Sequence, residues 1–198
     1  MARIAVIYGS RYGQTQKVSG RIADLARARG HEVIVIELQH PPQALSLAGM
    51  DAAFVGAPVY YGRHHKDVTR FVTDHRADLE RIPSAFFSVS GSAASENAEK
   101  QIEARQCVDT FLQQTGWHPS SLAMFGGAMA NSQYSWIFRM MIQFVARKSG
   151  MNIDPKRDYE YTDWVAVEHF ATSFLDRLPP REPHAGARIS EERHVPSA

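Results

Sequence analysis

Short runs of apolar residues recur along this chain, and each is followed by a polar or glycine-containing turn. The first run, Arg3–Tyr8 (RIAVIY), stops at Gly9, and Gln14–Arg29 then carries apolar residues at helical spacing until Gly30. Strands that alternate with helices need right-handed crossovers, which make the strands parallel and cover both faces of the sheet. We therefore predict a doubly wound α/β fold.

The same alternation continues as far as residue 178, with one interruption. Residues 126–160 do not fit the pattern and form an insert before the last helix. Inserts of that length inside a compact domain are usually functional. The predicted strands are Arg3–Tyr8, Glu32–Leu38, Ala52–Ala57, Ser84–Ser90 and Leu122–Phe125, and the predicted helices are Gln14–Arg29, Lys66–His75, Glu96–Thr115 and Thr162–Leu178.

The composition limits the classes of protein to consider. The 198 residues suit one domain, predicted at residues 1–178, and the tail at 179–198 holds four of the ten prolines and no aromatic residue, so we expect it to be disordered. The 22 basic and 21 acidic residues give a net charge of +1, which offers no support for nucleic-acid binding. The single cysteine, Cys107, excludes an internal disulfide, and the nine histidines show no metal-ligand spacing, so we expect no metal.

The loop after the first predicted strand is a candidate phosphate site. It opens a helix, where free N–H groups and the helix dipole favour an anion, and Ser10 and Thr15 add hydroxyl donors. The loop lacks the lysine of a P-loop and the G-x-G-x-x-G of a dinucleotide site. A polar turn that caps a helix explains it equally well. The candidate residues are Ser10, Arg11, Tyr12, Gly13, Gln14 and Thr15.

Two further loops follow the third and fourth predicted strands. Because the carboxyl ends of parallel strands meet at one edge of a sheet, these loops should lie beside the first one. Aromatic faces beside a hydroxyl-rich phosphate loop suit a phosphorylated planar ring such as FMN, although a tyrosine taken alone is more often a packing residue. The candidates around the ring are Pro58, Val59, Tyr60, Tyr61 and Gly62 in the second loop, after the third strand, and Ser90, Gly91 and Ser92 in the third loop, after the fourth strand.

Six short motifs stand out between about residue 2 and residue 178. They are S-R-Y-G-Q-T (Ser10–Thr15), Y-Y-G-R-H-H (Tyr60–His65), P-S-A-F-F-S-V (Pro83–Val89), W-H-P (Trp117–Pro119), G-G-A (Gly126–Ala128) and Y-T-D-W (Tyr161–Trp164). With these motifs the sequence resembles the flavodoxin-like family, and most closely its branch of bacterial menaquinone-dependent protoporphyrinogen IX dehydrogenases. The loop motifs mark a flavodoxin, and Y-T-D-W with the insert before it marks the branch.

The resemblance implies a five-stranded parallel sheet in the order 2-1-3-4-5, with FMN as cofactor. The FMN phosphate would lie on Ser10–Thr15 and its ring between the second and third loops. The implied reaction is the oxidation of protoporphyrinogen IX to protoporphyrin IX in haem biosynthesis, with a quinone as electron acceptor. A flavin performs such redox chemistry itself, so no side chain need be catalytic. His64 and His65 are candidate proton acceptors, and a pair of surface histidines explains them equally well.

The insert contains an unusually apolar helical pattern at Ser135–Ser149 (SWIFRMMIQFVARKS), with only a narrow polar stripe and three basic residues. This helix could lie in a membrane interface, where a quinone is available, or line a porphyrin-sized pocket. It could equally be buried in a homodimer or pack in the monomer's own core. The predicted substrate or quinone region is Trp136, Arg139, Met140, Gln143 and Arg147.

Two other functions are consistent with the same loops. An electron-carrier flavodoxin usually presents an acidic surface, which the net charge of +1 and the basic insert argue against. An NAD(P)H:quinone reductase would bind its nucleotide transiently over the flavin. Because Gly9 breaks the first apolar run too early for a signal peptide, we expect a cytoplasmic protein. If the apolar helix of the insert lies in a membrane interface, the protein would be peripheral on the inner face of the cell membrane.

Overall fold

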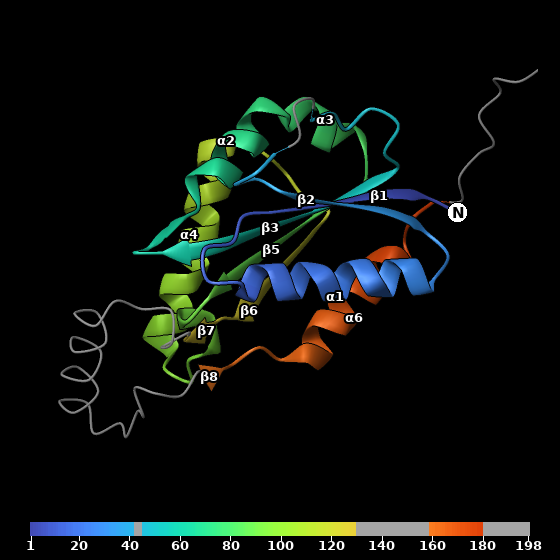
Figure 1. Ribbon diagram of the computed structural model, residues 1–198. Coiled ribbons are helices and arrows are strands. Elements are labelled where there is room, and N and C mark those ends of the chain that lie inside the picture. The colour runs from blue at the N-terminus through green and yellow to red at the C-terminus, as the bar shows by residue number, and fades with distance from the viewer. Residues whose placement is uncertain (42–44, 130–158, 180–198) are drawn as a thin grey trace, which may run out of the picture.

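The computed structural model describes residues 1–41, 45–129 and 159–179. Five parallel strands form one sheet in the order β2-β1-β3-β5-β6 (Figure 1). Counted along the chain, this is the predicted order 2-1-3-4-5. The strands are β1 (Arg3–Tyr8), β2 (Glu32–Glu37), β3 (Ala52–Tyr60), β5 (Ser84–Ser90) and β6 (Ser121–Gly126).

The three central strands, β1, β3 and β5, are buried on both faces, which explains why they read as nearly continuous apolar runs, whereas the edge strand β2 is partly exposed. Successive side chains of a strand point to opposite faces. In β1, Ile4 and Val6 pack into one core cluster, and Ala5 and Ile7 pack into the other. Each cluster therefore fills the space between one face of the sheet and the helices that cover it.

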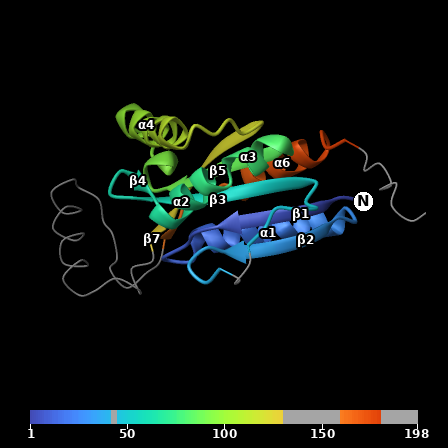
Figure 2. The ribbon, with the colours of Figure 1, turned by 90° about the horizontal axis from the view of Figure 1, so that it is seen from above.

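Helices cover the two faces unequally (Figures 1 and 2). On one face, α1 (Gln14–Ala28) and α6 (Trp164–Leu175) lie side by side and are joined by the ion pair between Arg21 and Glu168. The other face carries α2 (Lys66–Asp74), α3 (Arg76–Arg81) and α4 (Ala98–Thr115). The prediction of one helix over Lys66–His75 is therefore too simple, because α3 follows it directly, and the 3-10 turn η1 (Ser92–Ala94) precedes α4.

The third strand is longer than predicted. It does not end at Ala57 but continues to Tyr60, and it then turns back to pair with β4 (Arg63–His64) in an antiparallel hairpin. The two residues of the turn, Tyr61 and Gly62, have φ angles of 51° and 74°. A two-residue turn of this kind requires the left-handed conformation at both positions, which glycine adopts freely and tyrosine does not.

A second, two-stranded sheet pairs β7 (Ala128–Met129) with β8 (Tyr159–Glu160). The chain between them, residues 130–158, and the tail at 180–198 lie outside the described residues. The predicted helical insert therefore stays a prediction, as do Trp136, Arg139, Met140, Gln143 and Arg147. Within 1–41, 45–129 and 159–179, no helix is both long and apolar enough to cross a membrane.

Candidate functional site

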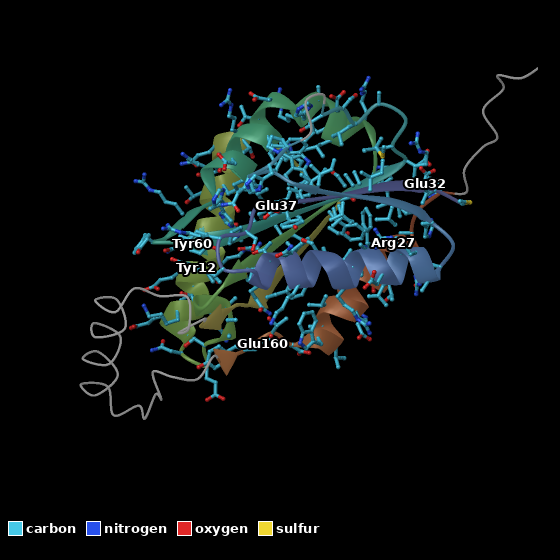
Figure 3. The ribbon with its side chains drawn as sticks, in the orientation of Figure 1. Tyr12, Arg27, Glu32, Glu37, Tyr60 and Glu160 are labelled. Atoms are coloured by element: carbon cyan, nitrogen blue, oxygen red, sulfur yellow. The ribbon has the colours of Figure 1, made fainter. Side chains whose placement is uncertain are left out.

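The first loop, Ser10–Thr15, lies at the carboxyl edge of the sheet. Figure 3 shows Tyr12 and Tyr60 together at this edge, with Arg27 and Glu32 at the opposite end of the sheet. The N–H of Gly9 donates to the carbonyl of Gly56 at 3.2 Å, which ties the start of the loop to β3. This edge, near the point where the strand order reverses, is where open α/β sheets bind ligands.

The first loop leaves the amino end of α1 open to an anion. Gly13 stands before the helix in the left-handed conformation, with φ 83°, and its N–H donates to the Ser10 hydroxyl at 3.1 Å. Asn97 and Asp163 cap α4 and α6 with their side chains, whereas α1 has no side-chain cap. The first N–H groups of α1 are therefore not used by a capping side chain, which is the arrangement that phosphates and carboxylates bind.

The two tyrosines of the second loop have different surroundings. The Tyr60 hydroxyl accepts a hydrogen bond from the N–H of Arg11 at 3.1 Å, and its ring meets the Tyr12 ring edge-on at 5.5 Å. Burial raises the pKa of Tyr60, so the phenol stays neutral. The side chain of Tyr61 is instead 85% exposed. Tyr60 therefore supports the first loop, and Tyr61 presents an open aromatic face.

A chain of hydrogen bonds joins the first and third loops through the segment before α6. The Gln14 amide donates to the Thr162 hydroxyl at 2.7 Å, and this hydroxyl donates to the carbonyl of Gly126 at 2.6 Å. The next residue, Gly127, donates its N–H to the carbonyl of Ser90 at 2.9 Å. The side chain of Gln14 is thus used to hold Thr162, which leaves only its backbone N–H for a ligand of the first loop.

Glu160 strengthens the same connection from the surface. Its carboxylate accepts from the Lys17 ammonium at 2.9 Å and from the Trp164 indole N–H at 2.7 Å. The hydrogen bond from Lys17, more than any other effect, lowers the pKa of this carboxyl group. Two contacts therefore hold the start of α1 to the segment before α6: the hydrogen bond between Gln14 and Thr162 and, nearer the surface, the ion pair between Lys17 and Glu160.

A cleft of about 480 Å³ opens between the β3–β4 hairpin, the third loop and α4. We call it the hairpin cleft. Its volume is within the usual range for sites that bind small molecules and cofactors. The N–H of Ala93 donates to the Ser90 hydroxyl at 3.1 Å, and this hydrogen bond fixes the backbone of the third loop. The residues that line the cleft are Val59, Tyr61, Gly62, Ser90, Gly91, Ser92, Glu103, Ala104, Gln106, Cys107 and Thr110.

The two candidate histidines lie outside the hairpin cleft. His64 Nε2 is 2.9 Å from the Ser88 hydroxyl, and burial lowers its pKa from 6.5 to about 4, so its ring is neutral near pH 7. His65 Nδ1 is buried with no hydrogen-bond partner among the described residues, and the nearest carboxylate oxygen, on Asp67, is 3.6 Å away. His64 is therefore not the surface residue that was one interpretation of the pair.

Most of the predicted site residues gather at this edge, with exceptions that have clear causes. Pro58 and Tyr60 belong to the extended β3 and do not line the hairpin cleft. Sequence reasoning missed the α4 wall, because a helical face without a motif gives no local signal. It also missed Thr162, although this residue stands in the Y-T-D-W motif. Cys107 lines the cleft and is half-buried, with its thiol donating to the Gly62 carbonyl at 3.3 Å.

A family model described as the flavodoxin domain matches residues 5–156. The chain belongs to the flavodoxin domain family. Membership implies a flavin cofactor, and the open helix end, the hydroxyl-bearing loop and the cleft at the same edge of the sheet fit one. The predicted family is therefore confirmed.

Comparison with curated proteins identifies relatives within this family. The chain is 28% identical over 166 residues to the protoporphyrinogen IX dehydrogenase [quinone] of Escherichia coli K12, covering 84% of this chain and 91% of the relative. It is 30% identical over 183 residues to the protein of the same name from Leishmania major, covering 89% of this chain and 77% of the relative.

Solved structures support the fold independently. Oxidised flavodoxin 1 from Bacillus cereus superposes with a TM-score of 0.55 at 18% identity, over 90% of this chain and all of that one. The flavodoxin of Streptococcus pneumoniae TIGR4 gives 0.52 at 16% identity, over 89% of this chain and 97% of that one. At these identities the likeness concerns the fold alone.

Proposed function

We propose that this protein is an FMN-dependent oxidoreductase that converts protoporphyrinogen IX to protoporphyrin IX in haem biosynthesis and passes the electrons to a quinone. The observation that carries the proposal is the hairpin cleft, which lies at the same carboxyl edge of the sheet as the uncapped start of α1. The substrate and acceptor are those in the names of the Escherichia coli and Leishmania major relatives.

In this proposal the first loop holds the FMN phosphate. Ser10 and Thr15 are 6% and 1% exposed and sit on either side of the Gly13 turn, so their hydroxyl groups supplement the helix N–H groups. Buried donors that are already in place bind a phosphate without the cost of ordering a loop. The Arg11 guanidinium, 5.5 Å from the centre of the Tyr12 ring, adds positive charge at the rim.

The flavin ring would occupy the hairpin cleft, with the open face of Tyr61 on one side and the third loop on the other. When bound, a flavin would supply two-electron redox chemistry between the porphyrinogen and the quinone, so the removal of six hydrogens from the porphyrinogen would take three rounds and three quinone molecules. The protein's part is to orient the ring and to leave one side of it open to the substrates. Burial raises the pKa of the Cys107 thiol at the cleft wall, so this group stays protonated and is no nucleophile.

An anaerobic fluorescence assay tests the proposal. Protein loaded with FMN is mixed with protoporphyrinogen IX and a menaquinone analogue, and the appearance of porphyrin fluorescence is compared with reactions that lack protein or quinone. The double variant Ser10→Ala/Thr15→Val should lose activity along with its FMN, and Thr172→Val, which removes a hydroxyl from α6, should keep it. Quinone-dependent porphyrin formation by wild type supports the proposal.

Absence of porphyrin formation by fully loaded wild-type protein would contradict it. Rapid bleaching of the flavin by NADPH alone would then favour an NAD(P)H:quinone reductase, and efficient reduction by a flavodoxin reductase would favour an electron carrier. Homodimer formation and contact with the inner face of the cell membrane stay predictions, because both concern the insert.

A further inference from the structure

A second groove, of about 630 Å³, lies between α2 and α4. It shares Gly62, Cys107 and Thr110 with the hairpin cleft, so the two hollows meet where the β3–β4 hairpin contacts α4. Nothing in the proposed binding of FMN uses it. We call it the α2–α4 groove, and a ligand that fills it can reach the edge of a ring bound in the hairpin cleft.

Positive charge predominates along the α2–α4 groove. Arg63, Lys66 and Arg70 line it, against the single carboxylate of Asp74, which is 3.6 Å from Arg70. Lys66 and Arg70 are four residues apart on α2 and therefore lie on one face of the helix. Arg63 and Lys66 form no ion pair with any residue of the described ranges. Two cations without an acidic partner thus face one hollow.

The floor of the groove is aromatic and uncharged. Phe111, which is 2% exposed, lies with its ring centre 4.9 Å from that of His64. The His64 ring is held by Ser88 and is neutral near pH 7, because its pKa is about 4. The positive charge of the groove therefore comes from the flexible side chains at its rim, and its floor suits an apolar group.

We propose that the α2–α4 groove binds the carboxylate groups of the tetrapyrrole substrate, with Arg63 and Lys66 as their main partners. This inference rests on the proposed function. A porphyrinogen combines a large apolar macrocycle with propionate side chains on one edge. Arginine and lysine at the rim match the propionates, because a guanidinium binds a carboxylate through paired hydrogen bonds and an ammonium binds it as a point charge. The macrocycle then extends over Gly62 towards the hairpin cleft.

Binding of a porphyrin that is not turned over tests the groove directly. FMN-loaded protein is titrated with mesoporphyrin IX and with its dimethyl ester, and porphyrin fluorescence is followed. Wild type should bind the diacid about tenfold more tightly than the ester, and Arg63→Gln/Lys66→Gln should lose that preference. The matched control is Arg27→Gln/Arg81→Gln, which removes the same charge from two exposed ion pairs outside the groove, with Arg27 at the opposite end of the sheet (Figure 3).

Equal affinity of wild type for diacid and ester, or an unchanged preference in the groove variant, would overturn the inference. Turnover separates this result from a failure of the proposed function. If porphyrinogen is oxidised, the groove variant should raise KM about tenfold with little change in kcat, and an unchanged KM counts against the groove. If no porphyrinogen is oxidised but the diacid preference exists and depends on Arg63 and Lys66, the groove stands and the proposed function falls.

A nucleotide is the competing occupant, and the same variant identifies it. If wild type lacks the diacid preference and the groove variant instead raises the NADPH concentration needed to reduce the flavin, the groove is a nucleotide site and the inference is wrong. FMN content and the flavin absorption spectrum should be the same in all three proteins, because none of the four substituted side chains lines the hairpin cleft.

Discussion

The first loop and the β3–β4 hairpin lie at the same edge of the sheet, but they are held in opposite ways. Ser10, Gln14 and Thr15 of the first loop are buried, and hydrogen bonds from Gln14 through Thr162 to Gly126 connect the loop to the rest of the fold. The hairpin projects from β3, and Tyr61 at its tip is 85% exposed. The loop is therefore a preformed anchor, and the hairpin displays an aromatic face that the fold itself does not use.

The hairpin tip also carries a conformational cost. Tyr61 has a φ of 51°, and a left-handed residue other than glycine costs about 1 kcal/mol. Asparagine would suit that turn position better. A strained and exposed tyrosine is consistent with a function in ligand contact, since strain of this kind concentrates at binding sites. Variants of the first loop and of the hairpin should therefore affect stability and FMN binding differently.

The largest effect should come from Gly126→Ala, which attacks the anchor. A Cβ atom at this position would lie 2.3 Å from the Tyr161 carbonyl oxygen, so the segment that carries Thr162 must move. We expect a loss of about 3 kcal/mol in the free energy of unfolding, together with weaker FMN retention. Thermal unfolding measures it. Gly20→Ala, with open space around the new Cβ inside α1, should instead raise stability by up to about 1 kcal/mol.

Loss of FMN without loss of fold is expected from Ser10→Ala/Thr15→Val. Two buried hydroxyl partners of a charged phosphate disappear, so the affinity for FMN should fall about a hundredfold. Fluorescence titration of the apoprotein measures it, and Thr172→Val on α6 is the control. Unchanged FMN affinity would mean that the loop is only a helix-capping turn.

The free energy of unfolding should depend on pH because of His64, which lies in β4 of the hairpin. Burial depresses its pKa to about 4 in the folded protein, against 6.5 in the unfolded chain, so the unfolded state binds more protons between these values. Stability should be full above pH 6.5 and fall by on the order of 2 kcal/mol as the pH drops towards 4. Denaturant unfolding at several pH values tests this, and His64→Phe should flatten that part of the profile.

The smallest effect should come from Tyr61→Asn at the tip. Stability should rise by about 1 kcal/mol because asparagine tolerates the left-handed turn, while FMN affinity falls by about tenfold with the lost ring. Tyr61→Phe keeps both ring and strain and should resemble wild type. A fall in stability of Tyr61→Asn would show that the exposed tyrosine does support the fold.

The order of the sheet could be predicted because alternation of strands and helices is a local pattern with few allowed topologies. The hairpin could not, because Tyr61-Gly62 is not one of the usual turn pairs and nothing local extends β3 beyond Ala57. Tyr60 and Tyr61 were predicted together to surround the ring, yet Tyr60 ends β3 and packs on the first loop, whereas Tyr61 lies in the turn and is exposed.

The rest of the candidate site depends on contacts between distant segments. Gln14 and Thr162 are 148 residues apart in sequence, so no spacing rule joins them. Cys107 lies in α4, half-buried at the cleft wall, where its thiol contacts Gly62 of the distant hairpin, a contact 45 residues apart in sequence that no local pattern indicates. Family motifs marked these regions without giving their geometry.

The central claim is that the first loop binds the phosphate and that Tyr61 contacts the flavin ring. Comparison of FMN with riboflavin, which lacks the phosphate, tests this claim most directly. The affinities of both flavins would be measured for wild type, Ser10→Ala/Thr15→Val and Tyr61→Asn. We predict that wild type strongly prefers FMN, that the loop variant loses this preference, and that Tyr61→Asn weakens both flavins by the same factor. Equal binding of the two flavins by wild type, or an intact preference in the loop variant, would contradict the account.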